Sequence, residues 1–119
     1  MTPSYQLGQK GEAIAAAHLI KKKYCILEKN FRYRKAEIGL IVRQNNLVIA
    51  VEITTRSSSF FGAPASFLKY KQQQRIVEAL DYYIKQNNLE VEVRFDIISI
   101  VKTKKEFEVE HIENAFYHF

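Results

Sequence analysis

The sequence predicts an α/β fold with a mixed central β-sheet flanked by helices, in the order α-β-β-β-α-β-β. Three observations predict this class. A helix-forming segment with an apolar stripe opens the chain. Three strand-like runs separated by short polar breaks follow, which indicates hairpins and antiparallel pairing. A second helical segment separates the third and fourth strands, so the chain must cross over and the sheet must be mixed.

Each element has its own signal. Residues 4–22 are rich in alanine and end in lysines that suit the carboxyl end of a helix. The polar residues 44–46 mark a hairpin, and Pro64 marks the approach to the second helix, which ends at Asn87. The strands are expected at residues 24–33, 36–43, 47–55, 91–101 and 107–112, and the second helix reaches about residue 86.

Length and composition indicate one soluble domain spanning residues 1–119. Hydrophobic residues make up 47% of the 119 and charged residues 26%, as in ordinary globular proteins. No apolar run approaches the roughly 20 residues of a membrane span. With one cysteine and no export signal, we expect a cytoplasmic location and no disulfide framework. Cys25 itself is expected to be a small core residue.

The charge is +5 at pH 7, and its basic part is concentrated in one stretch. Such a one-sided basic field favours nucleic acid or another anionic surface. The alternative is a solvated helix end followed by an edge strand that lysines protect. Phe60, in a polar loop, is placed to stack on an unpaired base. The candidate nucleic-acid contacts are Lys21, Lys22, Lys23, Arg32, Arg34, Lys35, Arg56 and Phe60.

Glu52 lies near the end of the most apolar run in the chain, residues 47–53. A carboxylate in a central strand is costly unless a metal ion, a cation or a hydrogen-bond network compensates it. Alternation puts Glu37 and Gly39 on one face of their strand, and Glu52 and Thr54 on one face of the next. If the hairpin is in register, these faces meet at one end of the sheet.

Several motifs, taken together in their order and spacing, resemble the YraN family across nearly the whole chain. These are small bacterial proteins with a restriction-endonuclease-like fold, similar to archaeal Holliday-junction resolvases. The matching segments are Gly8-x-x-Gly11-Glu12, Asn30-x-Arg32, Ala36-Glu37-Ile38-Gly39-Leu40-Ile41, Val51-Glu52-Ile53-Thr54-Thr55-Arg56, Phe61-Gly62-x-Pro64, Lys71 with Arg75, Arg94-Phe95-Asp96 and His111-Ile112-x-Asn114-Ala115-Phe116.

The resemblance implies a metal-dependent nuclease centre, with two departures. Gly39 stands where the family has a metal-binding aspartate, and Thr54 stands where it has a catalytic lysine. Glu12 and Glu52 remain as candidate ligands for Mg²⁺ or Mn²⁺. Glu37 and Lys71 are the residues that could replace the missing groups. The candidate catalytic residues are thus Glu12, Glu37, Glu52 and Lys71.

Structural roles are open alternatives for the same residues. Glu12 can pair with Lys10, Glu37 with Arg43 or Lys35, and Glu52 with Arg56 or Lys71. His18 is expected to be a core histidine whose hydrogen bonds are satisfied. Asp96 is expected to be structural.

Three functions follow from this sequence. The first is nucleic-acid binding, to DNA rather than RNA, with an impaired or lost endonuclease centre and no obligatory cofactor. The second is a weak Mg²⁺- or Mn²⁺-dependent endonuclease acting on branched or single-stranded DNA. The third is a non-catalytic protein-interaction module. A homodimer is expected only by analogy with resolvases.

Overall fold

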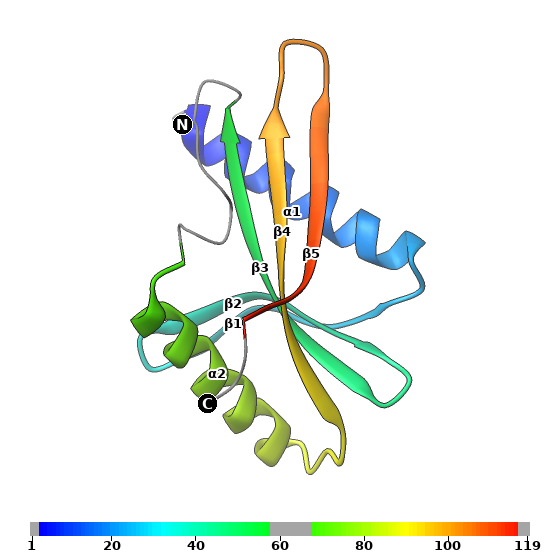
Figure 1. The fold of residues 1–119 in the computed structure, drawn as a ribbon, viewed down its shortest axis with the longest axis vertical. Helices are drawn as coiled ribbons and strands as arrows, with labels where there is room; N and C mark the ends of the chain where they lie inside the picture. The colour runs from blue at the N-terminus through cyan, green and yellow to red at the C-terminus, as the bar shows by residue number, and fades with distance from the viewer. Residues whose placement is uncertain (1–2, 58–67, 117–119) are drawn as a thin grey trace.

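The computed structural model describes residues 3–57 and 68–116, and places two helices and five strands there in the predicted order (Figure 1). The expected α/β class and its order α-β-β-β-α-β-β are confirmed. The elements are α1 (Pro3–Lys21), β1 (Cys25–Tyr33), β2 (Ala36–Gln44), β3 (Leu47–Ser57), α2 (Tyr70–Gln86), β4 (Glu92–Lys102) and β5 (Phe107–Phe116).

The five strands form one mixed sheet in the order β1-β2-β3-β4-β5. The pairs β1–β2, β2–β3 and β4–β5 are antiparallel, whereas β3 and β4 are parallel along their whole length. The segment containing α2 provides the crossover that parallel pairing requires. β3 is therefore the central strand, which explains why its run from Val48 to Val51 is fully buried.

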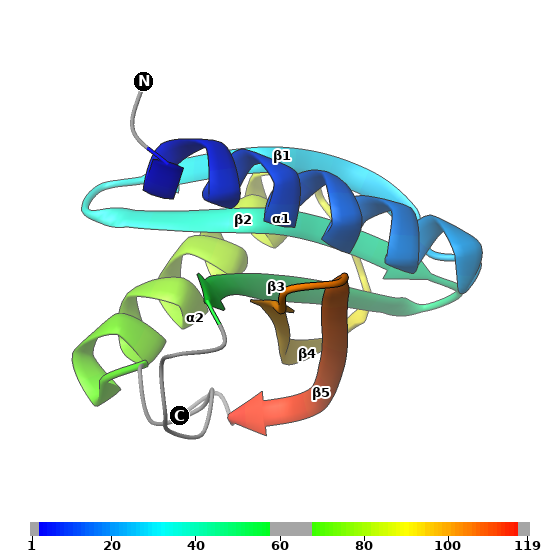
Figure 2. The same ribbon diagram turned by 90° about the horizontal axis from the view of Figure 1, so that it is seen from above.

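The two helices lie on opposite faces of the sheet (Figures 1 and 2). α1 packs its Ala15 and Leu19 against buried residues of β2, β3 and β4. α2 covers the other face over β1 and β2, with Ile76 and Leu80 in its core contact. Full burial of such aliphatic side chains contributes about 1.5–3 kcal/mol each. Among the described residues, neither helix has the length and apolarity needed to cross a membrane.

α1 approaches β3 closely at Gly11, which is buried. A Cβ atom at this position would collide with the side chain of Thr55 on β3. Gly8, one turn earlier in α1, has open space where its Cβ would lie. The two glycines of the opening motif therefore have different roles, and only Gly11 sets the distance between α1 and the sheet.

β2 and β3 separate at one end and form a fork. Their pairing runs from Gln44 opposite Leu47 only as far as Leu40 opposite Val51. Beyond this point β2 pairs only with β1, and β3 pairs only with β4. Figure 1 shows the two arms diverging, β3 upward and β2 toward the start of α2. The two strand ends that carry the predicted site residues therefore lie on the two arms of this fork.

A buried polar network joins β4 to β5. The carboxylate of Asp96 is fully buried and accepts two hydrogen bonds from Arg94, at 2.8 and 2.9 Å, and one from the Asn114 backbone N–H at 3.0 Å. His111 Nε2 lies 2.8 Å from Oδ2, the carboxylate oxygen that also accepts from Arg94 Nη2. Burial alone would raise the pKa of Asp96, but the hydrogen bonds from His111, Arg94 and Asn114 hold it below its ordinary value. Asp96 is thus structural, as expected.

The second helix ends at Gln86 as expected and begins at Tyr70, while Pro64 lies outside the described residues. Three expectations about local structure are corrected. β5 continues to Phe116 rather than ending at residue 112, with Asn114 in a left-handed conformation near the irregular pairing with β4. Cys25 is exposed, because it begins an edge strand. His18 Nε2 is buried with no hydrogen-bond partner in the described part of the chain, so this histidine is not satisfied.

Candidate functional site

Glu37 and Glu52 meet in a small cavity of about 100 Å³ between the arms of the fork and α2. Glu37 comes from the β1–β2 arm and Glu52 from the β3 arm. Lys35 and Arg75 line the same cavity, together with Gln72 of α2. The structure therefore brings together two of the predicted carboxylates and places two cations beside them.

Glu52 is half-buried, and its surroundings disfavour the ionised form. Burial, followed by the negative charge of Glu37, raises the pKa of Glu52 from 4.5 to about 7. None of the five ion pairs described here involves Glu52, and its pairing with Arg56 or Lys71 stays a prediction. A carboxyl group that titrates near neutrality can donate or accept a proton, or can bind a divalent cation that offsets the repulsion.

Glu37 has a partner of its own. Its Oε2 atom lies 2.7 Å from Nε of Arg32, directly across the β1–β2 pair. This is a strand-edge ion pair, as one of the structural alternatives proposed, but with Arg32 instead of Arg43 or Lys35. Both side chains are largely exposed, so the pair adds little stability. A ligand that offers a phosphate to Arg32 could displace Glu37.

Glu12 is in a different place. It lines a cavity of about 280 Å³ on the α1 side of the fork, together with Gly39 and Lys29. Glu52 is not among the residues that line this cavity, and Glu12 is not among those around Glu52. Shared binding of one metal ion by Glu12 and Glu52 stays a prediction. The described residues include no group of three or more His, Cys, Asp or Glu that could hold a metal ion.

Gly39 and Thr54, the two departures from the family pattern, differ in the space and the hydrogen-bond partners around them. A Cβ atom on Gly39 would meet Ile53 Cδ1 at 3.3 Å, a side-chain end that can shift. Thr54 Oγ1 is buried and has no hydrogen-bond partner among the described residues. An unsatisfied buried hydroxyl typically costs about 1–3 kcal/mol. Thr54 therefore buries a polar group for which the described residues provide no hydrogen-bond partner.

The cation that lines the carboxylate cavity on α2 is Arg75, and not Lys71. Lys71 is exposed in the first turn of α2, one turn before Arg75. Sequence reasoning assigned Arg75 only to the family pattern and gave it no role. The signal that could have found it is its spacing: Gln72, Arg75 and Ile76 recur at three- and four-residue intervals, and all three line the cavity.

The basic residues that crowd the sequence form two groups in space. Lys21, Lys22 and Lys23 lie before the start of β1, whereas Arg34 and Lys35 follow its end. A nine-residue strand spans about 30 Å, so the two groups do not form one patch. Only the second group, with Arg32, lies beside the fork. Arg56 is half-buried near the end of β3, and Phe60 lies outside the described residues.

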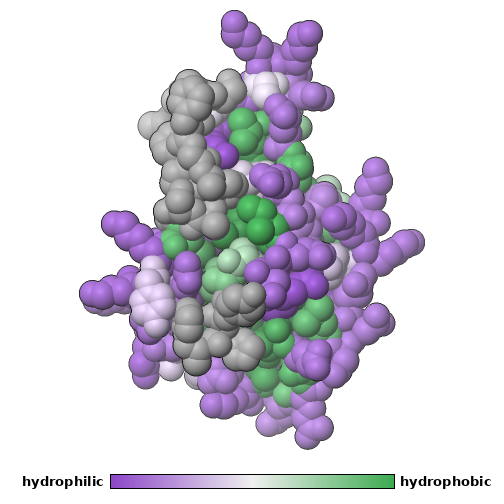
Figure 3. Space-filling model, viewed as in Figure 1, coloured by the Kyte–Doolittle hydropathy of each residue, from purple (hydrophilic) through white to green (hydrophobic). Residues whose placement is uncertain are grey.

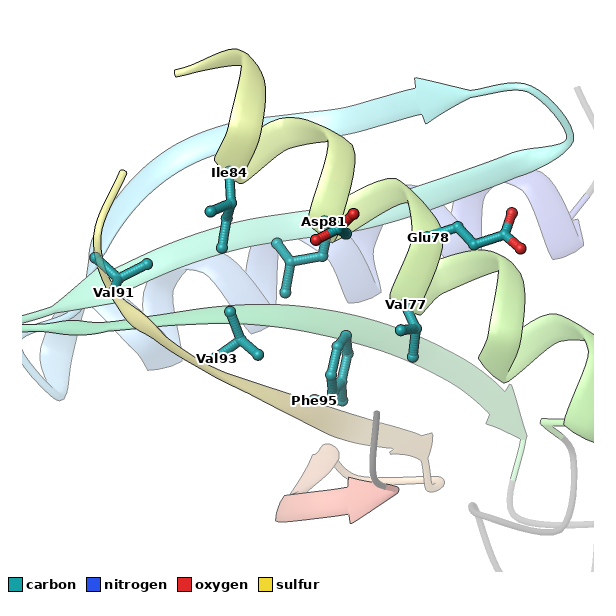
Figure 4. Close-up of a pocket in the computed structure, with 8 residues that line it drawn as sticks. Val77, Glu78, Asp81, Ile84, Val91, Val93 and Phe95 are labelled. Atoms are coloured by element: carbon teal, nitrogen blue, oxygen red, sulfur yellow. The ribbon is translucent and has the colours of Figure 1, made fainter. Parts of the chain in front are cut away.

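A larger cavity, of about 470 Å³, lies away from the carboxylates between α2 and the first half of β4. Figure 3 shows hydrophobic surface gathered there, bordered by hydrophilic side chains. In Figure 4 the apolar side chains of both elements point toward one another, while Glu78 and Asp81 point away. Its apolar walls are formed by Val77, Leu80, Ile84, Val91, Val93 and Phe95.

Comparison with known proteins identifies the family. Residues 11–100 match the model of the uncharacterised protein family UPF0102. A UPF0102 protein of Christiangramia forsetii is 47% identical over 119 residues, and one of Flavobacterium psychrophilum is 45% identical, with both chains of each pair fully covered. One of Thermodesulfovibrio yellowstonii is 41% identical over 112 residues, covering 94% of this chain and 96% of its own. The chain therefore belongs to UPF0102, the YraN family that its motifs resemble.

Proposed function

We propose that this protein binds nucleic acid at the fork between β2 and β3, on a nuclease scaffold whose metal-dependent cleavage centre is impaired or lost. One observation carries the proposal. Glu37 and Glu52 meet at the fork beside Lys35 and Arg75, while Gly39 and Thr54 occupy the positions of the expected aspartate and lysine. The cations suit phosphates, and the two missing groups are those that cleavage would require.

The remaining donors suit only a weak metal site. Mg²⁺ and Mn²⁺ prefer oxygen ligands, and Mg²⁺ often takes one or two carboxylates with water and substrate phosphate as the other ligands. Glu37 and Glu52 would supply the carboxylates, because a bound cation would offset the repulsion that raises the pKa of Glu52. When bound, such an ion polarises the phosphate and activates the attacking water. Arg75 and Lys35 would hold the phosphate in either case.

Binding and cleavage are separable by experiment. The test compares this protein with Glu52→Gln and with a restored Gly39→Asp/Thr54→Lys form, on branched and single-stranded DNA with Mg²⁺ or Mn²⁺. We expect cleavage only by the restored form, because adding a metal carboxylate and a cation should recover a factor on the order of 10³. A Cβ atom at Gly39 would require only a small shift of the Ile53 side chain, with the Val51 carbonyl oxygen at contact distance.

Binding should depend steeply on salt. With phosphate contacts at Arg32, Lys35 and Arg75, affinity for single-stranded DNA should fall about 20-fold between 50 and 200 mM salt. Lys35→Ala and Arg75→Ala should each reduce that slope by about 0.7, whereas the matched change Lys105→Ala, in the turn between β4 and β5 and outside the carboxylate cavity, should not. Affinity that does not vary with salt would contradict the proposal.

A weak Mn²⁺-dependent endonuclease is the second candidate, and the Glu37–Glu52 pair favours it. In that case the unmodified protein cleaves DNA slowly, and Glu52→Gln abolishes the cleavage. Such a result would mean that Glu37 and Arg75 substitute for the missing groups, so that the cleavage centre is rebuilt and not impaired.

The third candidate, a protein-interaction module, is favoured by the apolar cavity between α2 and β4 (Figure 4). Its simplest form is a homodimer through that face. Sedimentation of this protein and of Val93→Glu separates the possibilities: a dimer that dissociates in the variant supports this role, and a monomer in both removes the homodimer.

A further inference from the structure

A series of flat side chains lies at the end of β1, on the α2 side. The ring of Tyr82, on α2, stacks on Tyr33 of β1 with 4.3 Å between centroids and 21° between planes. The guanidinium of Arg34 lies over the Tyr33 ring at 5.1 Å. Phe31 extends the series at the other end, 6.5 Å from Tyr82 and 28° from its plane. We call Tyr33, Tyr82 and Arg34 the tyrosine stack.

The tyrosine stack is open to solvent. Tyr82 keeps 40% of its surface exposed, which few large apolar side chains of the described residues do. A cavity of about 590 Å³ adjoins it, lined by all three members together with Lys85 and Gln86 of α2. Rings that only packed α2 onto β1 would not need this exposure, and a cavity of this size accommodates a small planar group.

Arg34 is held in a conformation that arginine does not favour. Its φ is 57°, in the left-handed region where a side chain costs about 1–2 kcal/mol relative to glycine. The two-residue turn between Tyr33 and Ala36 would accept glycine or asparagine at that position at little cost. A strained arginine that lies over the half-buried Tyr33 ring, next to the exposed Tyr82, points to a role for its guanidinium.

We propose that the tyrosine stack binds an unpaired nucleobase, so that the nucleic acid taken at the fork is single-stranded or carries an unpaired segment. This inference rests on the proposed function. Aromatic rings and guanidinium planes are the surfaces on which unpaired bases stack. Lys35, the next residue along the turn, lines the carboxylate cavity. A strand whose phosphate contacts Lys35 therefore passes the tyrosine stack.

The charges around the stack favour a base over a phosphate. Two acids, Glu78 and Asp81, line the cavity. Asp81 forms an ion pair with Lys85 at 2.9 Å, and Glu78 is not part of that pair. Glu78 repels phosphate but accepts hydrogen bonds from the amino groups of bases. The phosphate consequently lies on the Arg34 and Lys35 side, and the base lies toward α2.

The first test separates base stacking from phosphate binding. Fluorescence anisotropy would measure binding of a labelled single-stranded oligodeoxynucleotide, an abasic strand of the same length, and the blunt duplex. We expect the base-containing strand to bind about tenfold more tightly than the abasic strand. Tyr82→Ala should remove this difference without changing abasic binding, and Tyr82→Phe should keep it.

A matched pair of variants tests the arginine without harming the fold. Arg34→Gly and Lys23→Gly each remove one positive charge and relieve one left-handed residue, since Lys23 has a φ of 74°. Lys23 lies at the other end of β1. Arg34→Gly should reduce the preference for base-containing strands several-fold, whereas Lys23→Gly should leave that preference unchanged.

The outcomes distinguish this inference from the proposed function. Equal binding of base-containing and abasic strands, unchanged in Tyr82→Ala, would overturn the base site and leave phosphate binding at the fork intact. Preference for the blunt duplex would also overturn it. Failure to bind any of the three probes, at low salt, would refute both proposals together.

Discussion

The carboxyl group of Glu52 should make the fold less stable as the pH rises. Its pKa is about 7 in the folded protein and 4.5 when unconstrained, so the folded state binds the proton more tightly. The contribution to stability is therefore complete below pH 4.5 and is lost as the pH rises to 7. Each pH unit between the two values corresponds to about 1.4 kcal/mol, or about 3.5 kcal/mol in all, and solvent screening of this half-buried group reduces the contribution to about 2–3 kcal/mol.

Glu52→Gln removes the charge and keeps the shape. We expect this variant to be about 2–3 kcal/mol more stable than the parent at pH 8, and within a few tenths of a kcal/mol of it at pH 4.5. Urea unfolding monitored by circular dichroism at several pH values measures the difference in unfolding free energy between the two proteins at each pH. The contributions of other titrating groups cancel in the difference between the two proteins.

Glu37→Gln provides the control. It removes the nearby negative charge, which is the smaller cause of the raised pKa, so part of the pH dependence should disappear and most should remain. The reasoning is refuted if Glu52→Gln changes stability equally at pH 4.5 and pH 8, or if it destabilises the protein at pH 8. The second result would mean that a cation pairs with ionised Glu52.

Three further predictions concern other parts of the fold. Thr54→Val should raise the free energy of unfolding by about 1 kcal/mol, measured by urea titration, because it removes a buried hydroxyl without a partner among the described residues. Gly11→Ala should lower the melting temperature, at a cost of about 1–3 kcal/mol in unfolding free energy, because its Cβ meets Thr55. Gly8→Ala should instead raise the unfolding free energy by about 0.5–1 kcal/mol, and equal effects of the two changes would contradict the close approach of α1 to β3 at Gly11. Asp96→Ala should cost about 3–5 kcal/mol in calorimetry, and a loss below 1 kcal/mol would show that the buried network is not needed.

The sequence predicted the fold through patterns that act locally. The apolar run before Glu52 identified the central strand, and side-chain alternation correctly indicated that Glu37 and Glu52 approach one another. The fork could not be foreseen in this way, because alternation gives the face of a side chain and not the point where two twisting strands separate. Glu12 and Gly39 consequently line one cavity and Glu52 another.

Position along the chain was a poor guide to position in space for the charged residues. Lys23 and Arg34 are 11 residues apart, but an extended strand between them carries them to opposite ends of β1. Lys71 and Arg75 lie on the same face of α2, one helical turn apart, and only the later of the two lines the carboxylate cavity, which depends on how far α2 extends past the fork. Cys25 is apolar enough for a core, yet β1 is an edge strand and leaves it exposed.

The place of β5 at the edge of the sheet bears on self-association. Its outer rim presents free backbone donors and acceptors, which in many proteins recruit a second copy into a continuous sheet. Here β5 carries Glu108, Glu110 and Glu113, all exposed. Antiparallel pairing of two such edges would set glutamates of one copy against those of the other, at the cost of like-charge repulsion. The acidic edge thus disfavours the joining of two such sheets through β5.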